Sequence, residues 1–140
     1  MNISVKSRAH RCLRDKERYH TFDGTNKKIE DYPVTLEADE NPIGVFENIP
    51  NQVKDSIIIT DKGMHYCFEG NSSKKVRYSD ITGTSYPEPD KKRTEEILML
   101  HLRNGESFPL FIKRLSDDQR FNDLFNFMRF IYRVKSDLES

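Results

Sequence analysis

Residues 97–112 read ILMLHLRNGESFPLFI, and this stretch decides the fold. Apolar residues alternate on both sides of Asn104-Gly105, the residue pair most typical of a two-residue β-hairpin, because both central positions of a type I′ turn need positive φ. Pro109 lacks an N–H donor, so the second strand is expected at a sheet edge or at a bulge. The residues predicted to face inward are Leu98, Leu100, Leu102, Phe108, Leu110 and Ile112.

Shorter runs before the hairpin have the same β character. Alternating or β-branched residues predict strands at 42–47, 56–60, 64–68, 75–78 and 81–86. Asp61-Lys62-Gly63 is predicted as a tight turn in which Gly63 takes positive φ. With the hairpin, the chain is expected to contain about seven short antiparallel strands.

One long amphipathic helix is predicted after the hairpin. Ser116-Asp117-Asp118-Gln119 has the pattern of a capping box at its start. At 100° per residue, one apolar stripe is expected to close the open end of the sheet. The residues of this first stripe are Phe121, Leu124, Phe125, Met128, Ile131 and Tyr132. The expected fold is mainly β (α+β), a partly open barrel capped by a C-terminal helix.

A second apolar stripe lies beside the first on the same helix. It contains Phe127, Phe130, Val134 and Leu138, and one sheet cannot cover both stripes. One interpretation is that the N-terminal arm or a long loop packs on it. The other is that Phe127, Phe130 and Val134 bind a protein partner or form a homodimer, because large exposed apolar patches mark interaction sites.

Residues 1–31 differ in composition from the rest of the chain. They hold few large apolar residues, and the first 20 carry six basic and two acidic side chains. A helix over residues 4–18 would have only a weak apolar stripe. We therefore expect a charged N-terminal extension (1–31) followed by one domain (32–140).

Composition restricts the class of protein. The 140 residues contain 23 basic and 23 acidic side chains, a balance that argues against nucleic-acid binding. Cys12 and Cys67 lack metal or redox spacing, which indicates reduced thiols, with Cys67 in the core. There is no apolar run of membrane-spanning length and no signal-peptide pattern, so we expect a cytoplasmic protein.

The titratable residues do not form a recognisable catalytic or metal-binding pattern. His65 and His101 are predicted as partly exposed strand residues, and Asp39-Glu40 as solvated. His10, Cys12 and His20 have irregular spacing for a zinc site, and the glycines do not cluster into a phosphate-binding loop. We therefore expect no catalytic residues, no metal and no cofactor.

Two phrases resemble a known family. Residues 57–66 (IIITDKGMHY) and 78–81 (YSDI), with the order of strands and the single final helix, look like bacterial pleckstrin-homology-like and GRAM-type domains over residues 40–136. The resemblance implies two packed antiparallel sheets with a helix at one end, and a non-enzymatic scaffold for lipid headgroups, peptides or proteins. Lipid-binding members place several basic residues between the first two strands, where this chain has only Lys54.

The leading functional hypothesis is a non-enzymatic protein–protein interaction module, such as a small bacterial adaptor or an immunity-type protein that binds one cognate partner. The alternative is a domain that binds a lipid headgroup or another anion, and only this alternative involves a membrane surface. Its candidate residues are Lys54, Lys74, Lys75 and Arg77.

Overall fold

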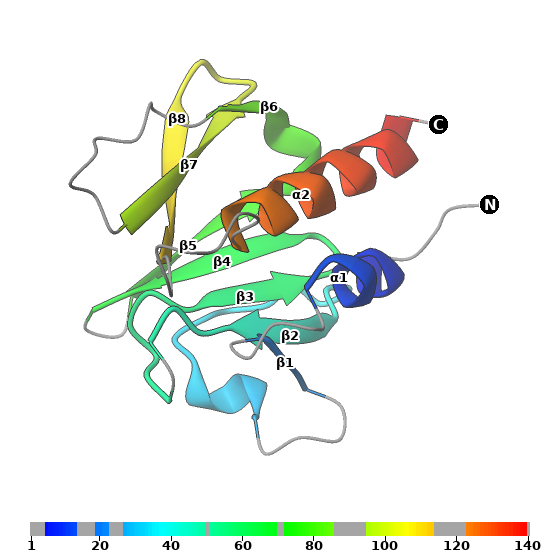
Figure 1. The fold of residues 1–140 in the computed structure, drawn as a ribbon. Coiled ribbons are helices and arrows are strands. Elements are labelled where there is room, and N and C mark those ends of the chain that lie inside the picture. Colours follow the sequence, from blue (N-terminus) through cyan, green and yellow to red (C-terminus); the bar gives the residue numbers. More distant parts are fainter. Residues whose placement is uncertain are drawn as a thin grey trace.

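The structure, a computed structural model, describes residues 5–13, 19–22, 27–49, 51–69, 72–85, 95–113 and 123–139. Over these residues the chain forms eight β-strands in two antiparallel sheets, with two α-helices (Figure 1). The first sheet has the order β1 (Tyr19–Thr21), β2 (Pro42–Phe46), β3 (Ile57–Thr60), β4 (Gly63–Phe68) and β5 (Ser72–Arg77). The second has the order β6 (Ile81–Ser85), β7 (Glu95–Leu102) and β8 (Ser107–Lys113). The helices are α1 (Val5–Leu13) and α2 (Asp123–Glu139).

The predicted strands are all present, as β2 to β8. β1 was missed because a strand of three residues is too short to show an alternating pattern. β8 lies at an edge of its sheet and carries Pro109, as expected. The strands form two sheets and not a closed barrel, so the mainly β fold class is confirmed and the barrel is not.

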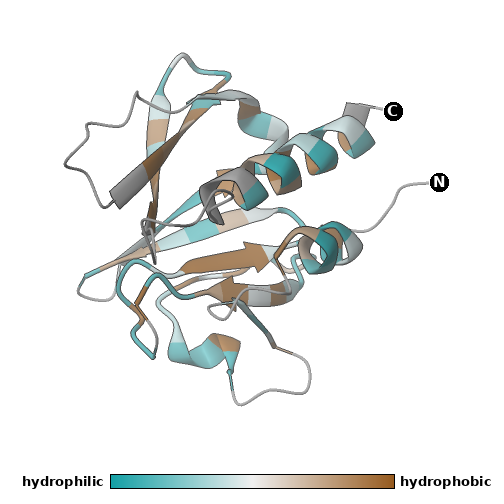
Figure 2. Cartoon of the chain, viewed as in Figure 1, coloured by the Kyte–Doolittle hydropathy of each residue, from teal (hydrophilic) through white to brown (hydrophobic). Residues whose placement is uncertain are grey.

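One hydrophobic core joins both sheets to both helices. It includes Ile57 and Ile59 of β3, Leu98 and Leu100 of β7, and Leu110 of β8. Figure 2 shows hydrophobic residues concentrated along β3, whereas α2 alternates between hydrophobic and hydrophilic positions. The alternation read from the hairpin therefore identified its inward faces correctly.

The turn of the hairpin differs from the predicted type. Gly105 has φ of 88°, while Asn104 is not among the residues with positive φ, so a type I′ turn is excluded. The N–H of Gly105 donates to the carbonyl of Leu102 (3.0 Å), and the N–H of Leu102 donates to the carbonyl of Glu106 (2.9 Å). This is a type I turn followed by a glycine in the left-handed region, the usual three-residue hairpin loop.

Gly63 also has a different role from the predicted one. It does not take positive φ and is the first residue of β4. A Cβ atom at this position would collide with the backbone carbonyl of Val76 on β5. Glycine is therefore needed here because two backbones approach closely.

The buried face of α2 combines residues of both predicted stripes: Ile131 of the first stripe is 1% exposed, as expected. Phe127, Phe130 and Val134 are 0%, 0% and 1% exposed, so the expected partner-binding stripe belongs to the core. The ring of Phe127 packs edge-on against Phe46 of β2 at a centroid distance of 4.9 Å. Tyr132, expected to face the sheet, is 74% exposed. Phe121 and the side chains of Leu124 and Phe125 lie outside the described residues.

The N-terminal helix covers part of the second stripe. α1 packs beside α2 (Figure 1), and Ala9 and Leu13 are buried in the same core as Phe127 and Phe130. β1 adds a strand to the first sheet. The expected boundary at residue 31 therefore separates elements that share one sheet and one core. The capping-box residues 116–119 lie outside the described residues.

Residues 27–41, here called the strap, cover the outer face of the first sheet. Tyr32 of the strap packs with Val45, Ile58 and Cys67 in a second, smaller core. The hydroxyl of Ser73 on β5 donates to the carbonyl of Pro33 at 2.7 Å. Both cysteines are free thiols, and Cys67 is buried as predicted.

Candidate functional site

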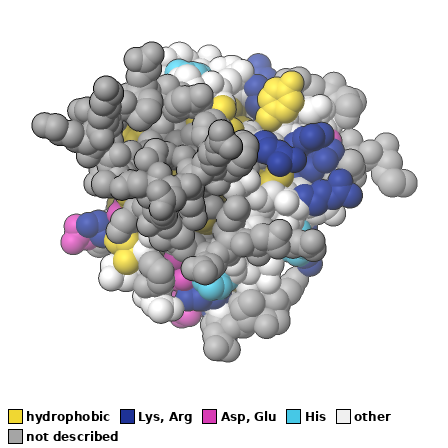
Figure 3. Space-filling view, viewed as in Figure 1, with side chains coloured by type: hydrophobic (Ala, Val, Ile, Leu, Met, Phe, Trp, Pro, Cys, Tyr) yellow, Lys and Arg dark blue, Asp and Glu magenta, His cyan; other side chains and the backbone are white. Residues whose placement is uncertain are grey.

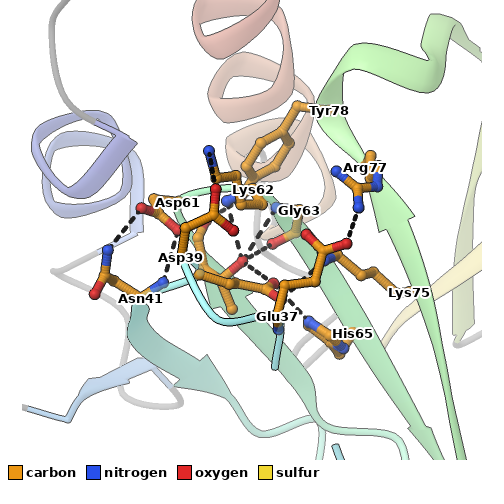
Figure 4. A network of polar contacts seen from close by, with 12 residues as sticks. Glu37, Asp39, Asn41, Asp61, Lys62, Gly63, His65, Lys75, Arg77 and Tyr78 are labelled. Atoms are coloured by element: carbon orange, nitrogen blue, oxygen red, sulfur yellow. Dashed lines mark hydrogen bonds and ion pairs between the residues drawn. The ribbon is translucent and has the colours of Figure 1, made fainter. Parts of the chain in front are cut away.

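A buried polar cluster lies where the strap meets the first sheet (Figure 4). Its centre is the carboxylate of Glu40, which accepts hydrogen bonds from Nζ of Lys75 (2.8 Å) and from Oγ1 of Thr60 (2.5 Å). Nε2 of His65 lies 2.8 Å from Oε2 of Glu40. Because an ionised carboxylate only accepts hydrogen bonds, Nε2 of His65 carries the proton.

The cluster keeps Glu40 ionised. Burial opposes ionisation, but the hydrogen bonds from Lys75, Thr60, His65 and the backbone N–H of Glu37 outweigh it and lower the pKa of Glu40 to about 2. The carboxylate is therefore charged at neutral pH and is paired with the partly buried ammonium group of Lys75.

Although the cluster contains Thr, His and Glu, its geometry does not activate a nucleophile. Activation needs a base in contact with the hydroxyl group. Here Thr60 and His65 both bind Glu40, and among the described residues no hydrogen bond joins His65 to Thr60. His65 is also only 2% exposed. The arrangement instead ties the strap to the sheet.

Two predictions about this region were wrong. His65 is buried although it was expected to be partly exposed, and Glu40 is buried although it was expected to be solvated. His65 lies on the face of β4 opposite Met64 and Tyr66, as the alternation indicated. That face is buried because the strap packs on it, and the alternation of residues in β4 does not indicate this packing.

Two of the four predicted anion-binding residues lie at this cluster and are already paired. Nζ of Lys75 is 2.8 Å from Oε1 of Glu40 and 3.3 Å from Oε2 of Glu37. Arg77 also forms an ion pair with Glu37. Their charges are thus largely neutralised by strap residues.

The other two anion-binding candidates lie elsewhere. Lys74 projects to the opposite face of β5, where its Nζ lies 5.3 Å from the centre of the Phe108 ring. Lys54 is in the loop before β3 and forms an exposed pair with Glu69 at 3.8 Å. The structure therefore does not gather Lys54, Lys74, Lys75 and Arg77 into one basic patch.

A different surface combines an exposed aromatic residue with basic residues. An open depression of about 440 Å³ lies between β6 and α2. We call this surface the Tyr132 face; it is lined by Thr84, Met128, Arg129, Tyr132 and Arg133. Figure 3 shows basic side chains gathered beside an exposed hydrophobic one on the surface over α2.

The arginines of the Tyr132 face carry exposed positive charge. Arg129 and Arg133 are exposed, and within the described part of the chain neither has a carboxylate at ion-pair distance. The sequence did not indicate this face because Tyr132 belongs to the apolar stripe that was predicted to close the sheet. The exposed side of α2 is determined by how α1 and the two sheets pack on this helix.

Comparison with protein-family models, with curated proteins and with solved structures gives no match for this chain. Neither described helix combines the length and the hydropathy needed to cross a membrane. Within the described ranges, no group of three or more His, Cys, Asp or Glu side chains is arranged to hold a metal ion.

Proposed function

We propose that this protein is a non-enzymatic interaction module that binds a protein partner through the Tyr132 face. The observation that carries the proposal is the 74% exposure of Tyr132 beside Arg129 and Arg133, at the edge of an open depression. Tyr and Arg are the side chains most enriched among residues that dominate binding energy at protein interfaces, and Met is enriched at interfaces in general. An adaptor or an immunity-type protein would use such a surface.

The residues of the Tyr132 face favour a partner of different sequence and not a second copy of this chain. A symmetric dimer would bring the same surface of each copy together. Arg129 and Arg133 of both copies would then lie in one interface, and an excess of like charge there is unfavourable. The proposed partner is therefore a protein of different sequence.

The buried cluster supports a structural role for the groups that could otherwise suggest catalysis. Glu40, His65 and Thr60 are buried, and both His65 and Thr60 are hydrogen-bonded to the carboxylate of Glu40. A polar cluster of this kind fixes the strap on the sheet, and the surface available for function is then the one formed by the helices.

Site-specific photo-crosslinking in the native host tests the proposal. Tyr132 is replaced by p-benzoylphenylalanine, and the matched control carries the same residue at Pro109, an exposed position on β8. We expect one distinct protein of different sequence to crosslink from position 132 and not from position 109. Equal products from both positions, no product from position 132, or a crosslink to a second copy of the chain would overturn the proposal.

A further inference from the structure

The Tyr132 face is one part of a larger basic surface that both helices form. Arg11 of α1 is exposed, and among the described residues it lacks a carboxylate at ion-pair distance, like Arg129 and Arg133 of α2. α1 contains no acidic residue. Three exposed guanidinium groups, none at ion-pair distance from a carboxylate of the described residues, therefore belong to two helices that pack side by side.

Cys12 of α1 is partly buried against the core that α1 and α2 share. Burial raises the pKa of Cys12, while the charges of Arg129, Arg133, Arg8 and Arg11 all act on it in the opposite direction. One thiol thus lies within the field of four guanidinium groups, two from each helix.

Only one of the four arginines has a carboxylate partner among the described residues. Nε and Nη2 of Arg8 donate to the two carboxylate oxygens of Asp137, at 2.8 and 2.9 Å. This two-point contact fixes α1 on α2 and engages both oxygens of Asp137. Arg133, one turn before Asp137 on α2, acts on that carboxylate through its charge but does not lie at ion-pair distance from it, so its exposed guanidinium group can still pair with an external anion.

We propose that the surface formed by Arg11, Arg129, Arg133 and Tyr132 binds an acidic segment of the protein partner. This inference rests on the proposed function and names the chemistry of the partner. Carboxylates of the segment pair with the three guanidinium groups, whose planar donors match carboxylate geometry. An apolar side chain of the segment enters the depression beside Met128 and Tyr132.

The same observations favour an acidic protein segment over other polyanions. The chain has equal numbers of basic and acidic side chains, whereas nucleic-acid-binding domains have a strongly basic balance. Stable membrane attachment needs an apolar face that inserts as well as basic charge. On this face the described exposed large hydrophobic residue beside the arginines is Tyr132 alone.

Binding of synthetic peptides to the full chain tests the inference. The probe is a fluorescein-labelled peptide that alternates glutamate and leucine, and its control has glutamine in place of glutamate; binding is followed by fluorescence anisotropy. We expect binding of the glutamate peptide that weakens several-fold as NaCl rises from about 50 to about 300 mM. Equal affinity for the two peptides would overturn the inference.

Charge-reversal variants locate the site. Arg129→Glu with Arg133→Glu is expected to weaken binding of the glutamate peptide about tenfold or more. The matched control, Lys54→Glu with Lys74→Glu, makes the same change in charge at two exposed positions away from the helices and is expected to retain binding. Circular dichroism and thermal unfolding confirm that each variant is folded. A larger loss in the control than in the arginine variant would overturn the assignment of the site.

Two further measurements separate this inference from the proposed function. Tighter binding of phosphatidylserine vesicles or of single-stranded DNA than of the glutamate peptide would overturn the acidic segment in favour of that polyanion. A partner crosslinked from position 132 together with equal affinity for both peptides would overturn the acidic chemistry alone. Absence of the crosslink would overturn the proposed function itself.

Discussion

The carboxylate of Glu40 and the imidazole of His65 lie 2.8 Å apart, although the residues are 25 positions apart in the chain. Their side chains are almost completely buried, and Lys75 supplies the positive charge beside them. The strap is thus attached to the first sheet by an ionised group in the interior. A charge of this kind is destabilising once one of its partners is removed.

Glu40→Gln should reduce the free energy of unfolding by about 3 kcal/mol, since Thr60, His65 and Lys75 lose the ionised acceptor that they share. Lys75 keeps only the Glu37 carboxylate, at 3.3 Å. Urea denaturation followed by fluorescence or circular dichroism measures the loss. The control is Glu69→Gln, which removes a carboxylate that is exposed and pairs weakly with Lys54 at 3.8 Å. Similar small effects of both variants would contradict a stabilising role for the cluster.

Stability should fall in acid because of Glu40. Its pKa is about 2 in the folded protein against the usual 4.5, so folding favours the ionised form. The resulting stabilisation of about 3 kcal/mol is present above the usual pKa and is lost as the pH falls from about 5 towards 2. Unfolding midpoints measured across this pH range check the slope. Glu40→Gln should flatten it, and an unchanged slope in that variant would assign the acid sensitivity to other groups.

The two sides of α2 should respond differently to truncation. Phe130→Ala removes a fully buried ring that packs edge-on against Tyr78 at a centroid distance of 5.8 Å, and should cost about 3–5 kcal/mol. Tyr132→Ala, two residues further along, should change stability by less than about 0.5 kcal/mol. Thermal or urea unfolding of the pair measures the contrast. Comparable losses would contradict the observed orientation of the helix.

The positions of the strands could be predicted from the sequence, but the segments that pack on each strand or helix could not. Strand positions from β2 to β8 follow from residue alternation and turn residues, which are local properties of the chain. Which face of a strand or helix is buried also depends on segments that are far away in the sequence. Residue alternation put His65 on the outer side of β4 correctly, but only the strap makes that side interior.

The candidate site shows the same limit. The apolar residues of α2 span a wide arc, so several orientations satisfied the pattern equally. The packing of α1 determines the orientation of α2, because Ala9 and Leu13 lie in the same core as Phe127 and Phe130. Because α1 has a weak apolar stripe and is rich in charge, the sequence left open whether the N-terminal arm packs on α2 or is solvated. Phe127 and Phe130 therefore remained candidates for a partner surface, and Tyr132 was wrongly expected to face the sheet.

Gly105→Ala should destabilise the hairpin by about 1 kcal/mol, because φ of 88° is unfavourable for a residue with a Cβ atom. Gly83→Ala on β6 is the matched control, since it has ordinary φ and a Cβ atom there meets no neighbour within 4 Å. The control should be neutral or slightly stabilising. Equal destabilisation by both substitutions in urea denaturation would mean that the turn conformation is not the cause.

Asp137→Asn should loosen α1 from α2. The substitution replaces the carboxylate that receives both hydrogen bonds from Arg8, and this ion pair lowers the pKa of Asp137. The contact should therefore also weaken as the pH falls through that lowered pKa, because protonation removes the charge. Hydrogen exchange of the α1 amides measures the effect, and we expect faster exchange in the variant. Ser136→Ala, at an exposed position on the same turn of α2, should leave these rates unchanged. If the α1 amides of Asp137→Asn keep their protection, the buried Ala9 and Leu13 hold the helix without the ion pair, and Arg11 stays in position for the acidic segment.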